Sequence, residues 1–518
     1  MISIRTWLLF AVVLVSVASH ASSPTTQPSE YFAIEVVDEQ TGRGVPMVEL
    51  QTTSSIRYYT DSAGLVAFYE PGLMNRKVFF SISALGYEFP PDGFGIRGAI
   101  LETKPGGNAT LKIKRINIAE RLYRITGQGI YRDTVLLGRK PPITQPLLNG
   151  EVTGQDGILN ASYRGKLYWF YGDTNRLFYA LGNFSMTGAT TELSEQIDPS
   201  TGFNLRYFTG PDGFARAMAP IGGEGVVWLY GVVILPDESG QQRMLAYFQR
   251  RRGLGAVLEN GFVLYNDEKE TFEKLKTVPL EPPYFPYLYH CRVKRDGTEY
   301  LYFSMPYPNL RVKAEWNSYL DLASYEGYTC LKPGTRYNDK DQVQLDRDAS
   351  GKLLWAWKKD TPPLKPEQQD ELITAGKMKR DESPFRLQDA DGGKPILLNN
   401  CSCFWNDYRK KYIMIASEMH GATELGEVWY SEADQPEGPW VNARKIITHA
   451  NKKGDAHDFY NPTQHPFFDR EGGRFIYLEG SYANSFSGNP HPTPYYEYNQ
   501  IMYRLDLADP RLSLPTAP

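Results

Sequence analysis

The chain has 518 residues, a net charge of −4 and a sequence pI near 6.1. This balance excludes the strongly basic surface that binding to nucleic acid or to anionic membranes requires. The 35 Tyr, 25 Phe and 9 Trp, with 46 Gly and 36 Pro to supply turns, are typical of an all-β protein. The length exceeds that of one ordinary core, so we expect more than one domain or one large closed architecture.

The first residues have the pattern of an export signal. Arg5 is the only charged residue in the first 22 positions, and Trp7–Val17 is an almost unbroken apolar run. A membrane span needs about 20 apolar residues, and this run is shorter. The small residues Ser19 and Ala21 suit cleavage after Ala21. We expect residues 1–21 to be a signal peptide and the protein to be secreted or periplasmic, with a membrane anchor as the alternative.

The four cysteines give no sign of a metal site. An exported protein of this size is permitted a disulfide but does not require one. On a strand, Cys401 and Cys403 would point to the same face, but no second Cys or His pair matches them. A zinc site is therefore not expected.

Residues 29–115 have the pattern of a small β-sandwich, in which apolar runs are separated by Gly- and Asp-rich turns. The expected strands are Tyr31–Val37, Val45–Leu50, Leu65–Phe68 and Val78–Ser83. The motif Val-Val-Asp-x-x-Thr-Gly-x-Gly-Val-Pro at 36–46, with Thr60-Asp-x-x-Gly64 and Gly86-Tyr87, resembles the transthyretin-like modules of carboxypeptidase regulatory domains. The resemblance implies a supporting module without chemistry of its own. A truncated chain that starts near Ile116 is therefore expected to keep the activity, provided that it folds.

Residues 116–508 contain an apolar hairpin that recurs five times, at 157–173, 219–233, 290–304, 400–418 and 464–482. A hairpin extended by one or two strands is the unit of a propeller blade, so the repeats predict a five-bladed β-propeller after the sandwich. The alternative is a pair of β-sandwiches with similar hairpins. We expect Asn499–Asp506 to join the first or last blade, and a short helix near Pro366–Met378.

Hairpin geometry gathers polar side chains at one edge of the expected ring. In an antiparallel hairpin, the start of the first strand and the end of the second lie at the same edge, opposite the turn. The catalytic candidates placed there are Asp156, Asp173 and Glu418, and the substrate-binding candidates are Arg216, His290, Asn400, His465 and Glu479. Each also has a structural interpretation, as a turn residue or a buried framework residue.

Carboxylates that face a common cleft suit glycoside hydrolysis, which needs one protonated acid and one ionised base or nucleophile. A base-to-acid separation of about 6.5–9.5 Å would indicate inversion, and one of about 5–5.5 Å retention. No metal site or cofactor is predicted, and a cation such as calcium at the axis stays open.

Four segments around these residues resemble known enzymes. Thr153-Gly-Gln-Asp-Gly157, with Gly165-Lys-Leu-Tyr-Trp-Phe-Tyr-Gly-Asp-Thr174, resembles the opening blade of five-bladed glycosidase-like families that include bacterial endo-arabinanases. Val428–Trp440 is similar to outer strands of arabinanase, xylosidase and fructosidase propellers, and Tyr460–Pro466 to their last inner strand. The resemblance implies that Asp156 is the base, which leaves the acid role to Asp173, Glu418 or Glu479. We assign Glu418 as acid and Asp173 as the group that tunes a pKa or orients water. The chain departs from the pattern where Arg216 and His290 stand in place of later acids.

Together these features predict an exported, monomeric glycoside hydrolase that acts on a polysaccharide or oligosaccharide, with no nucleic-acid or membrane partner. One alternative is a carbohydrate-binding propeller without catalysis. Another is a polysaccharide lyase, because Arg216 and His290 on one face would suit a uronic acid substrate.

Overall fold

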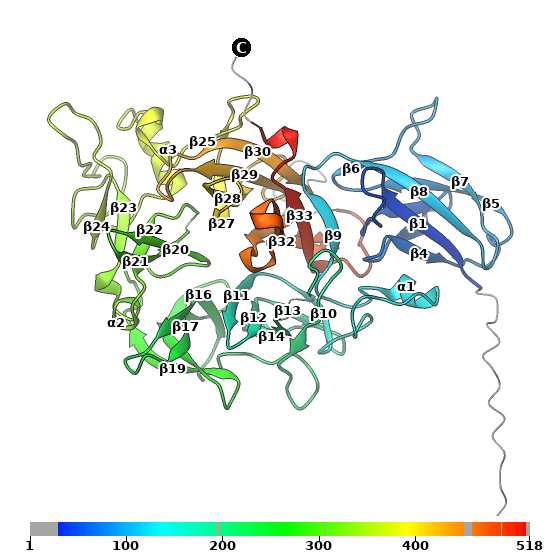
Figure 1. Cartoon of the computed structure of the whole chain (residues 1–518), viewed down its shortest axis with the longest axis horizontal. Helices are drawn as coiled ribbons and strands as arrows, with labels where there is room; N and C mark the ends of the chain where they lie inside the picture. Colours follow the sequence, from blue (N-terminus) through cyan, green and yellow to red (C-terminus); the bar gives the residue numbers. More distant parts are fainter. Residues whose placement is uncertain (1–29, 194–196, 305, 450–457, 488, 514–518) are drawn as a thin grey trace, which may run out of the picture.

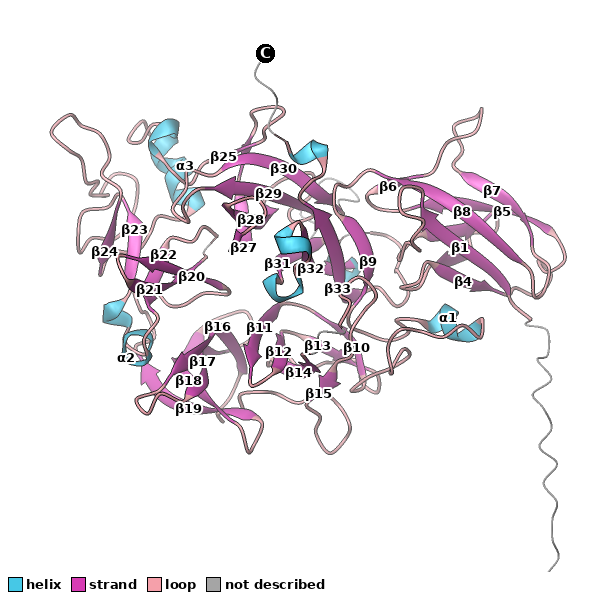
Figure 2. Cartoon of the chain, in the orientation of Figure 1, coloured by secondary structure: helices cyan, strands magenta, loops and turns pink. Residues whose placement is uncertain are grey.

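The computed structural model describes residues 30–193, 197–304, 306–449, 458–487 and 489–513. The expected signal peptide, residues 1–21, lies outside these ranges. The described chain is all-β, with many sheets and few helices, as in a propeller-type fold (Figures 1 and 2). None of its described helices has the length and apolar character needed to cross a membrane.

Residues 32–115 form two four-stranded sheets that share one hydrophobic core. In pairing order, one sheet contains β4 (Leu65–Phe68), β1 (Phe32–Asp38), β8 (Asn108–Arg115) and β6 (Tyr87–Glu88). The other contains β3 (Arg57–Tyr59), β2 (Glu49–Thr52), β5 (Lys77–Ser83) and β7 (Gly98–Glu102). The expected strand at Val45–Leu50 begins only at Glu49, because Met47 has a φ of 58°, which extended backbone does not allow.

Five further sheets of four or five strands lie around a common centre in the described chain, with their first strands innermost (Figure 2). In pairing order, the first sheet contains β11 (Ile158–Tyr163), β12 (Lys166–Tyr171), β14 (Thr187–Glu192) and β15 (Arg206–Tyr207). The second contains β16 (Val226–Pro236), β17 (Gln242–Arg251), β18 (Val257–Asn266) and β19 (Thr271–Val278). The third contains β20 (His290–Arg295), β21 (Thr298–Phe303), β22 (Leu310–Lys313), β23 (Glu326–Thr329) and β24 (Ala356–Lys359). The other two are β27 (Leu398–Asn406), β28 (Lys411–Glu418), β29 (Glu427–Ala433) and β30 (Val441–Thr448); and β31 (Phe459–Gln464), β32 (Phe475–Ala483), β33 (Tyr498–Asp506) and β9 (Glu120–Arg124).

Short elements connect these sheets. They are the strand pairs β10 (Val152–Gln155) with β13 (Thr174–Arg176) and β25 (Leu387–Gln388) with β26 (Pro395–Ile396), and the helices α1 (Arg132–Leu136), α2 (Trp316–Tyr319) and α3 (Pro366–Thr374). Helix α3 confirms the short helix expected near Pro366–Met378. Short 3-10 turns lie at Leu322–Ser324, Arg380–Glu382, Pro466–Phe468, Glu471–Gly473, Asn484–Phe486 and Pro510–Leu512.

The prediction of a hairpin at 219–233 is wrong. Residues 219–221 form no strand, and Val226–Pro236 is the first strand of its sheet, not the second. The glycines at 222, 223 and 225 all have positive φ and make a loop that leads into this strand. The actual hairpin turn begins at Asp237, whose side chain accepts hydrogen bonds from the N–H groups of Ser239 and Gln241.

The last sheet is completed by a strand from far earlier in the chain. β33 pairs with β32 on one side and with β9 on the other, so that Met502 lies beside Tyr123. The expectation that Asn499–Asp506 joins the first or last blade is therefore confirmed. Figure 1 shows β9 between β33 and the N-terminal sheets.

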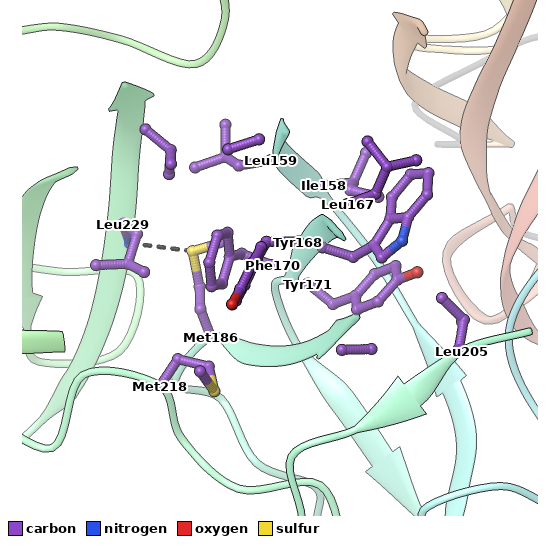
Figure 3. Close-up of a cluster of buried hydrophobic side chains, with 14 of the residues drawn as sticks. Ile158, Leu159, Leu167, Tyr168, Phe170, Tyr171, Met186, Leu205, Met218 and Leu229 are labelled. Carbon is purple, nitrogen blue, oxygen red and sulfur yellow. Dashed lines mark hydrogen bonds between the residues drawn. The ribbon is translucent and has the colours of Figure 1, made fainter. Parts of the chain in front are cut away.

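The first sheet packs against the second through a large apolar cluster (Figure 3). Phe170 is fully buried in it, and the Met186 sulfur accepts a hydrogen bond from the Leu229 N–H at 3.0 Å. These contacts fix the first two inner strands relative to each other, and with them the edge where Asp156 lies.

The N-terminal sheets share buried polar contacts with the ring of sheets. Arg121 is fully buried and donates to the carbonyl oxygens of Pro46, at 3.0 Å, and of Leu85. The Tyr496 hydroxyl donates to the Thr60 carbonyl oxygen at 2.7 Å. Met47 packs into the apolar cluster of the last two sheets. The N-terminal part therefore covers polar and apolar groups of the ring that water would otherwise reach.

We predict that a truncated chain starting at Ile116 will unfold at a markedly lower temperature than the full chain. Truncation removes two acceptors of the Arg121 guanidinium and uncovers the apolar surface against which Met47 packs, and a hydrogen bond to a charged group contributes about 1.5–3 kcal/mol. Tyr496→Phe, which removes a single interface hydrogen bond, should cost only about 1 kcal/mol. Thermal unfolding followed by circular dichroism measures both, and an unchanged melting temperature of the truncated chain would contradict the prediction.

Candidate active site

Asp156 and Asp173 lie opposite each other at one edge of the first sheet. Strand β11 begins with Ile158 paired to Tyr171, so the residues two positions beyond this pair also face each other. The Asp156 N–H donates to the Asp173 carbonyl oxygen at 3.1 Å, and the Asp173 N–H donates to Asp156 Oδ1 at 2.9 Å. The structure therefore brings these two sequence-predicted acids together, as the hairpin geometry requires. We call this edge, where first strands start and second strands end, the site edge.

The Asp156 carboxylate also takes hydrogen bonds from the last sheet. The Tyr460 hydroxyl, on β31, donates to Asp156 Oδ2 at 3.0 Å and lies 3.3 Å from the Tyr498 hydroxyl on β33. Both tyrosines hydrogen-bond to this carboxylate and counteract the effect of its burial on its pKa. Asp156 therefore lies in the seam where the first and last sheets meet.

Burial raises the pKa of both acids, and the charge of Asp156 also raises that of Asp173. Burial raises the pKa of Asp156 above its usual range, against the hydrogen bonds from Tyr498, Tyr460 and the Asp173 N–H. Burial, followed by the charge of Asp156, raises the pKa of Asp173 to about 7. A carboxyl group that keeps its proton to near-neutral pH, beside a second carboxyl group held by hydrogen bonds, is an arrangement that acid–base catalysis can use.

Amide and hydroxyl side chains continue the site along the seam. Asn400 donates from Nδ2 to Asn461 Oδ1 at 2.7 Å. The Gly157 N–H donates to Ser481 Oγ at 3.1 Å. Asn461 has a φ of 50°, a left-handed conformation that Asn tolerates better than most residues. The predicted Asn400 is thus joined through Asn461 to the neighbourhood of Asp156.

Glu418 belongs to a second carboxyl pair, on the fourth sheet. Trp429 Nε1 donates to Glu418 Oε2 at 2.8 Å, and Lys394 Nζ lies 3.5 Å from Glu418 Oε1. The partner acid is Glu427, which accepts from Lys445 Nζ and, at 3.0 Å, from the Ala422 N–H. Both carboxyl groups are buried, and the exposed ammonium of Lys394 marks the side of Glu418 that is nearest to solvent.

The two glutamates have pKa values shifted in opposite directions. Burial raises the pKa of Glu418, the Trp429 hydrogen bond lowers it, and the charge of Glu427 raises it, so that the net shift is upward. Burial also raises the pKa of Glu427, but the Lys445 hydrogen bond and the Ala422 N–H outweigh this and hold it below its usual range. Glu427 is therefore the ionised member and Glu418 the proton-holding member.

Gly421 allows the second pair to form. A Cβ at this position would lie 2.5 Å from Glu427 Oε2 and 2.9 Å from Glu418 Cδ. Any larger residue would have to displace one of the carboxyl groups. The turn after β28 therefore needs glycine here because the two acids fill the space beside it.

His290 lines a cavity of about 380 Å³ on the axis, which takes residues from the inner part of all five sheets. The cavity wall is mainly apolar, with Asn160 and Arg292 among its polar members. Burial, followed by the charge of Arg292, lowers the pKa of His290 to about 3. The imidazole is therefore neutral at any physiological pH.

His465 and Glu479, which were expected at the site edge, do not reach it in this structure. Strand β31 begins at Phe459, so His465 follows the end of the strand and not its start. Both side chains have no exposed surface, and His465 Nε2 lies 3.6 Å from Glu479 Oε1. Asn160 Nδ2 lies 3.2 Å from His465 Nδ1. The two residues form a polar contact inside the molecule that a substrate cannot touch.

The expected hairpin at 219–233 was also the basis for placing Arg216 at the site edge, and this hairpin does not form. The Arg216 guanidinium donates to the carbonyl oxygens of Lys269, at 3.3 Å, and of Glu270, at 2.8 Å. These residues form the turn between β18 and β19, whose Asp267 pairs with Arg164 in the first hairpin turn. The Arg216 guanidinium is therefore held by the turn between β18 and β19.

Sequence reasoning missed four residues of these clusters. Tyr460 and Asn461 lie in the motif that resembles a last inner strand, so their position was available, but their contacts with Asp156 and Asn400 were not. Glu427 begins a strand that reads as purely structural. No local sequence pattern marks Tyr498 as a site residue. Among the described residues, no group of three or more His, Cys, Asp or Glu could hold a metal ion.

Similarity to known proteins is confined to solved structures. No known family model matches the chain, and no curated protein matches it. Similar solved structures include the exo-β-1,3-galactanase from Phanerochaete chrysosporium with galactose, at 10% identity over 75% of this chain and 65% of that chain, with a TM-score of 0.37. The GH43_1 enzyme from Xanthomonas citri with xylose has 11% identity over 71% and 91%, with a TM-score of 0.35. An exo-1,5-α-L-arabinanase from a bovine ruminal metagenomic library has 11% identity over 69% and 95%, with a TM-score of 0.32. Since these TM-scores are below 0.5, we build the function from this chain's own residues.

We predict that Asp173→Asn stabilises the folded protein above pH 7 relative to wild type. The folded-state pKa of about 7 exceeds the unfolded value of about 3.9, so the folded state binds more protons between these pH values and wild-type stability falls as pH rises through this window. The variant lacks this loss, so its stability relative to wild type should rise between pH 5 and pH 8. Urea unfolding at both pH values measures it. The exposed turn variant Asp296→Asn is the control, and a difference that is the same at both pH values would contradict the prediction.

Proposed function

We propose that the protein is an exported, monomeric glycoside hydrolase whose five inner hairpins build five blades of one closed propeller. In this proposal residues 1–21 are the signal peptide, and residues 29–115 are a transthyretin-like module that supports the ring. The substrate is a polysaccharide or oligosaccharide bound at the site edge. No resident cofactor is needed for this chemistry, and a structural cation on the axis stays a prediction.

The observation that carries this proposal is that two carboxyl groups, Asp156 and Asp173, face each other in the seam between the first and last sheets, where burial and the charge of Asp156 raise the pKa of Asp173 to about 7. Glycoside hydrolysis needs a proton donor and an ionised carboxylate beside one sugar. Surface salt bridges would not create such a pair, because in the described part of the chain no basic side chain is among the groups that shift the pKa of either acid. Burial without a counter-ion is costly, and a site that tolerates it is a candidate for chemistry.

The roles follow from the protonation states. Asp156, which is oriented by Tyr460 and whose charge raises the pKa of Asp173, is the base or nucleophile. Asp173 tunes it and holds a proton below about pH 7. Glu418, whose pKa is raised by burial and by the charge of Glu427, is the acid. The separation of the Asp156 and Glu418 carboxyl groups in a substrate complex would then decide between inversion and retention.

The geometry disfavours a polysaccharide lyase. A lyase needs a base to remove a proton from a uronic acid and a positive group to neutralise the uronate carboxylate. His290, with a pKa of about 3, is a poor base at neutral pH. Arg216, the expected positive group, is engaged by the carbonyl oxygens of Lys269 and Glu270.

We predict that Asp156→Asn lowers turnover of a polysaccharide substrate by about 10²-fold or more, because a positioned base contributes at least that factor. The variant keeps the size of the side chain, so the fold should be intact. New reducing ends released from a panel of polysaccharides are the measurement, with Asp296→Asn as the control variant.

The same panel separates the alternatives. Absorbance from an unsaturated uronide would identify a lyase, and binding without any product would identify a sugar-binding protein. A wild-type rate for Asp156→Asn on a confirmed substrate would refute the assignment of the base.

A further inference from the structure

An exposed apolar segment begins four residues after Asp173. The run Leu177-Phe-Tyr-Ala-Leu-Gly-Asn-Phe184 contains no charged residue. Five of its large side chains are exposed: Leu177 by 48%, Phe178 by 52%, Tyr179 by 63%, Leu181 by 57% and Phe184 by 41%. Exposed apolar side chains are ordinary when scattered, but a contiguous group of this kind marks a surface that binds something. We call residues 177–184 the apolar loop.

The apolar loop is closed directly beside the acid pair. Thr174, the residue after Asp173, donates from its N–H to the Asn183 carbonyl oxygen at 2.9 Å and accepts from the Asn183 N–H at 2.8 Å. The Thr174 side chain is fully buried, where its hydroxyl accepts from Gln155 Nε2 at 3.0 Å and lies 2.9 Å from the Thr187 hydroxyl. Both ends of the loop are therefore fixed to the framework that positions Asp173.

Arg176 holds the loop in shape. Its Nη2 donates to the Gly182 carbonyl oxygen at 3.2 Å, across the loop. The same guanidinium lies 5.5 Å from the ring centre of Phe178 and 4.8 Å from that of Phe214, and these two rings meet edge to face at 6.1 Å. Phe178 is thereby used in the internal support of the loop, which leaves Tyr179 and Leu181 as its most exposed apolar side chains.

We propose that the apolar loop is a binding surface for an uncharged polysaccharide chain whose scissile bond lies at Asp156 and Asp173. This proposal rests on the hydrolase function and extends it to a substrate class. Aromatic side chains pack on the apolar faces of sugar rings, and the loop offers such faces without any charged group to pair with a uronate. Because Thr174 joins the apolar loop to Asp173, a polysaccharide chain bound on the loop would extend to the acid pair.

Two other occupants fit this surface less well. A lipid surface favours basic residues beside the apolar ones, and the one that adjoins this loop, Arg176, is engaged by the Gly182 carbonyl oxygen and the rings of Phe178 and Phe214. A second copy of the chain would cover the loop and the adjoining acid pair together, and so would exclude a polymer from the site. The fixed backbone also suits sugar stacking, since a preorganised surface loses less entropy on binding.

The test uses the full-length Asp156→Asn protein, which should hold polymers uncleaved. Affinity electrophoresis with arabinan, xylan and β-1,3-galactan as uncharged probes, and polygalacturonate as the charged probe, measures binding. We expect at least one uncharged polymer to bind more tightly than polygalacturonate. Adding Tyr179→Ala should raise the Kd for that polymer between about twofold and tenfold. Leu181→Ser should also raise it, and Phe94→Ala, which removes an apolar side chain 92% exposed in the N-terminal sheets, should not.

Three results would overturn the proposal. They are no binding of any uncharged polymer, an unchanged Kd in both loop variants, and loop variants that alter only self-association or binding to phosphatidylcholine vesicles. Hydrolysis by the wild-type protein is scored separately. If the wild type releases no reducing ends but binding depends on Tyr179, the surface stands and the hydrolase function fails. If hydrolysis occurs and binding ignores Tyr179 and Leu181, the hydrolase stands and the surface fails.

Discussion

The pairing of β9 with β33 is the contact on which the rest of the structure depends. It hydrogen-bonds residues 120–124, which precede the first inner sheet, to the last sheet, and so brings the two ends of the ring together. Only this closure sets Tyr460 and Tyr498 of the last sheet beside Asp156 of the first. It also carries the chain from the N-terminal sheets into the ring at Arg121, whose guanidinium bonds back to both parts. The candidate site is thus a product of ring closure and not of any single sheet.

The acids of the two carboxyl pairs are held against an electrostatic cost. Asp156 and Asp173 are buried beside each other, and Glu418 lies beside Glu427, although the repulsion within each pair lowers stability at neutral pH. The two pairs are relieved in different ways. Tyrosine hydroxyls and a backbone N–H stabilise Asp156, whereas Lys445 stabilises Glu427 with a full charge. In each pair one member, Asp173 or Glu418, has its pKa raised, a shift that a fold optimised only for stability would avoid.

The sequence was sufficient for the parts of this arrangement that local periodicity determines. Strand alternation and the hairpin turns place Asp156 opposite Asp173, and the register follows because no bulge interrupts β11 and β12. It was insufficient where register or chain path changes. A bulge between Tyr460 and Thr463 and an earlier strand start move His465 away from the site edge. The positive-φ glycines after residue 221 shift the second hairpin and remove Arg216. The contact of Tyr498 with Asp156 depends on ring closure, which no local pattern encodes.

The two edges of the ring also differ in how their loops are stabilised, and this difference bears on where function can evolve. At the opposite edge, Asp237 closes its hairpin turn on the backbone N–H groups of nearby residues, and Arg164 and Asp267 pair with each other, so polar groups there are consumed locally. At the site edge, Asp156 bonds across sheets and the apolar loop leaves Tyr179 and Leu181 without such internal use. A sheet edge whose polar groups are already paired offers little to a ligand. The edge with shared acids and uncommitted apolar side chains is the one that can exchange protein contacts for contacts with a sugar.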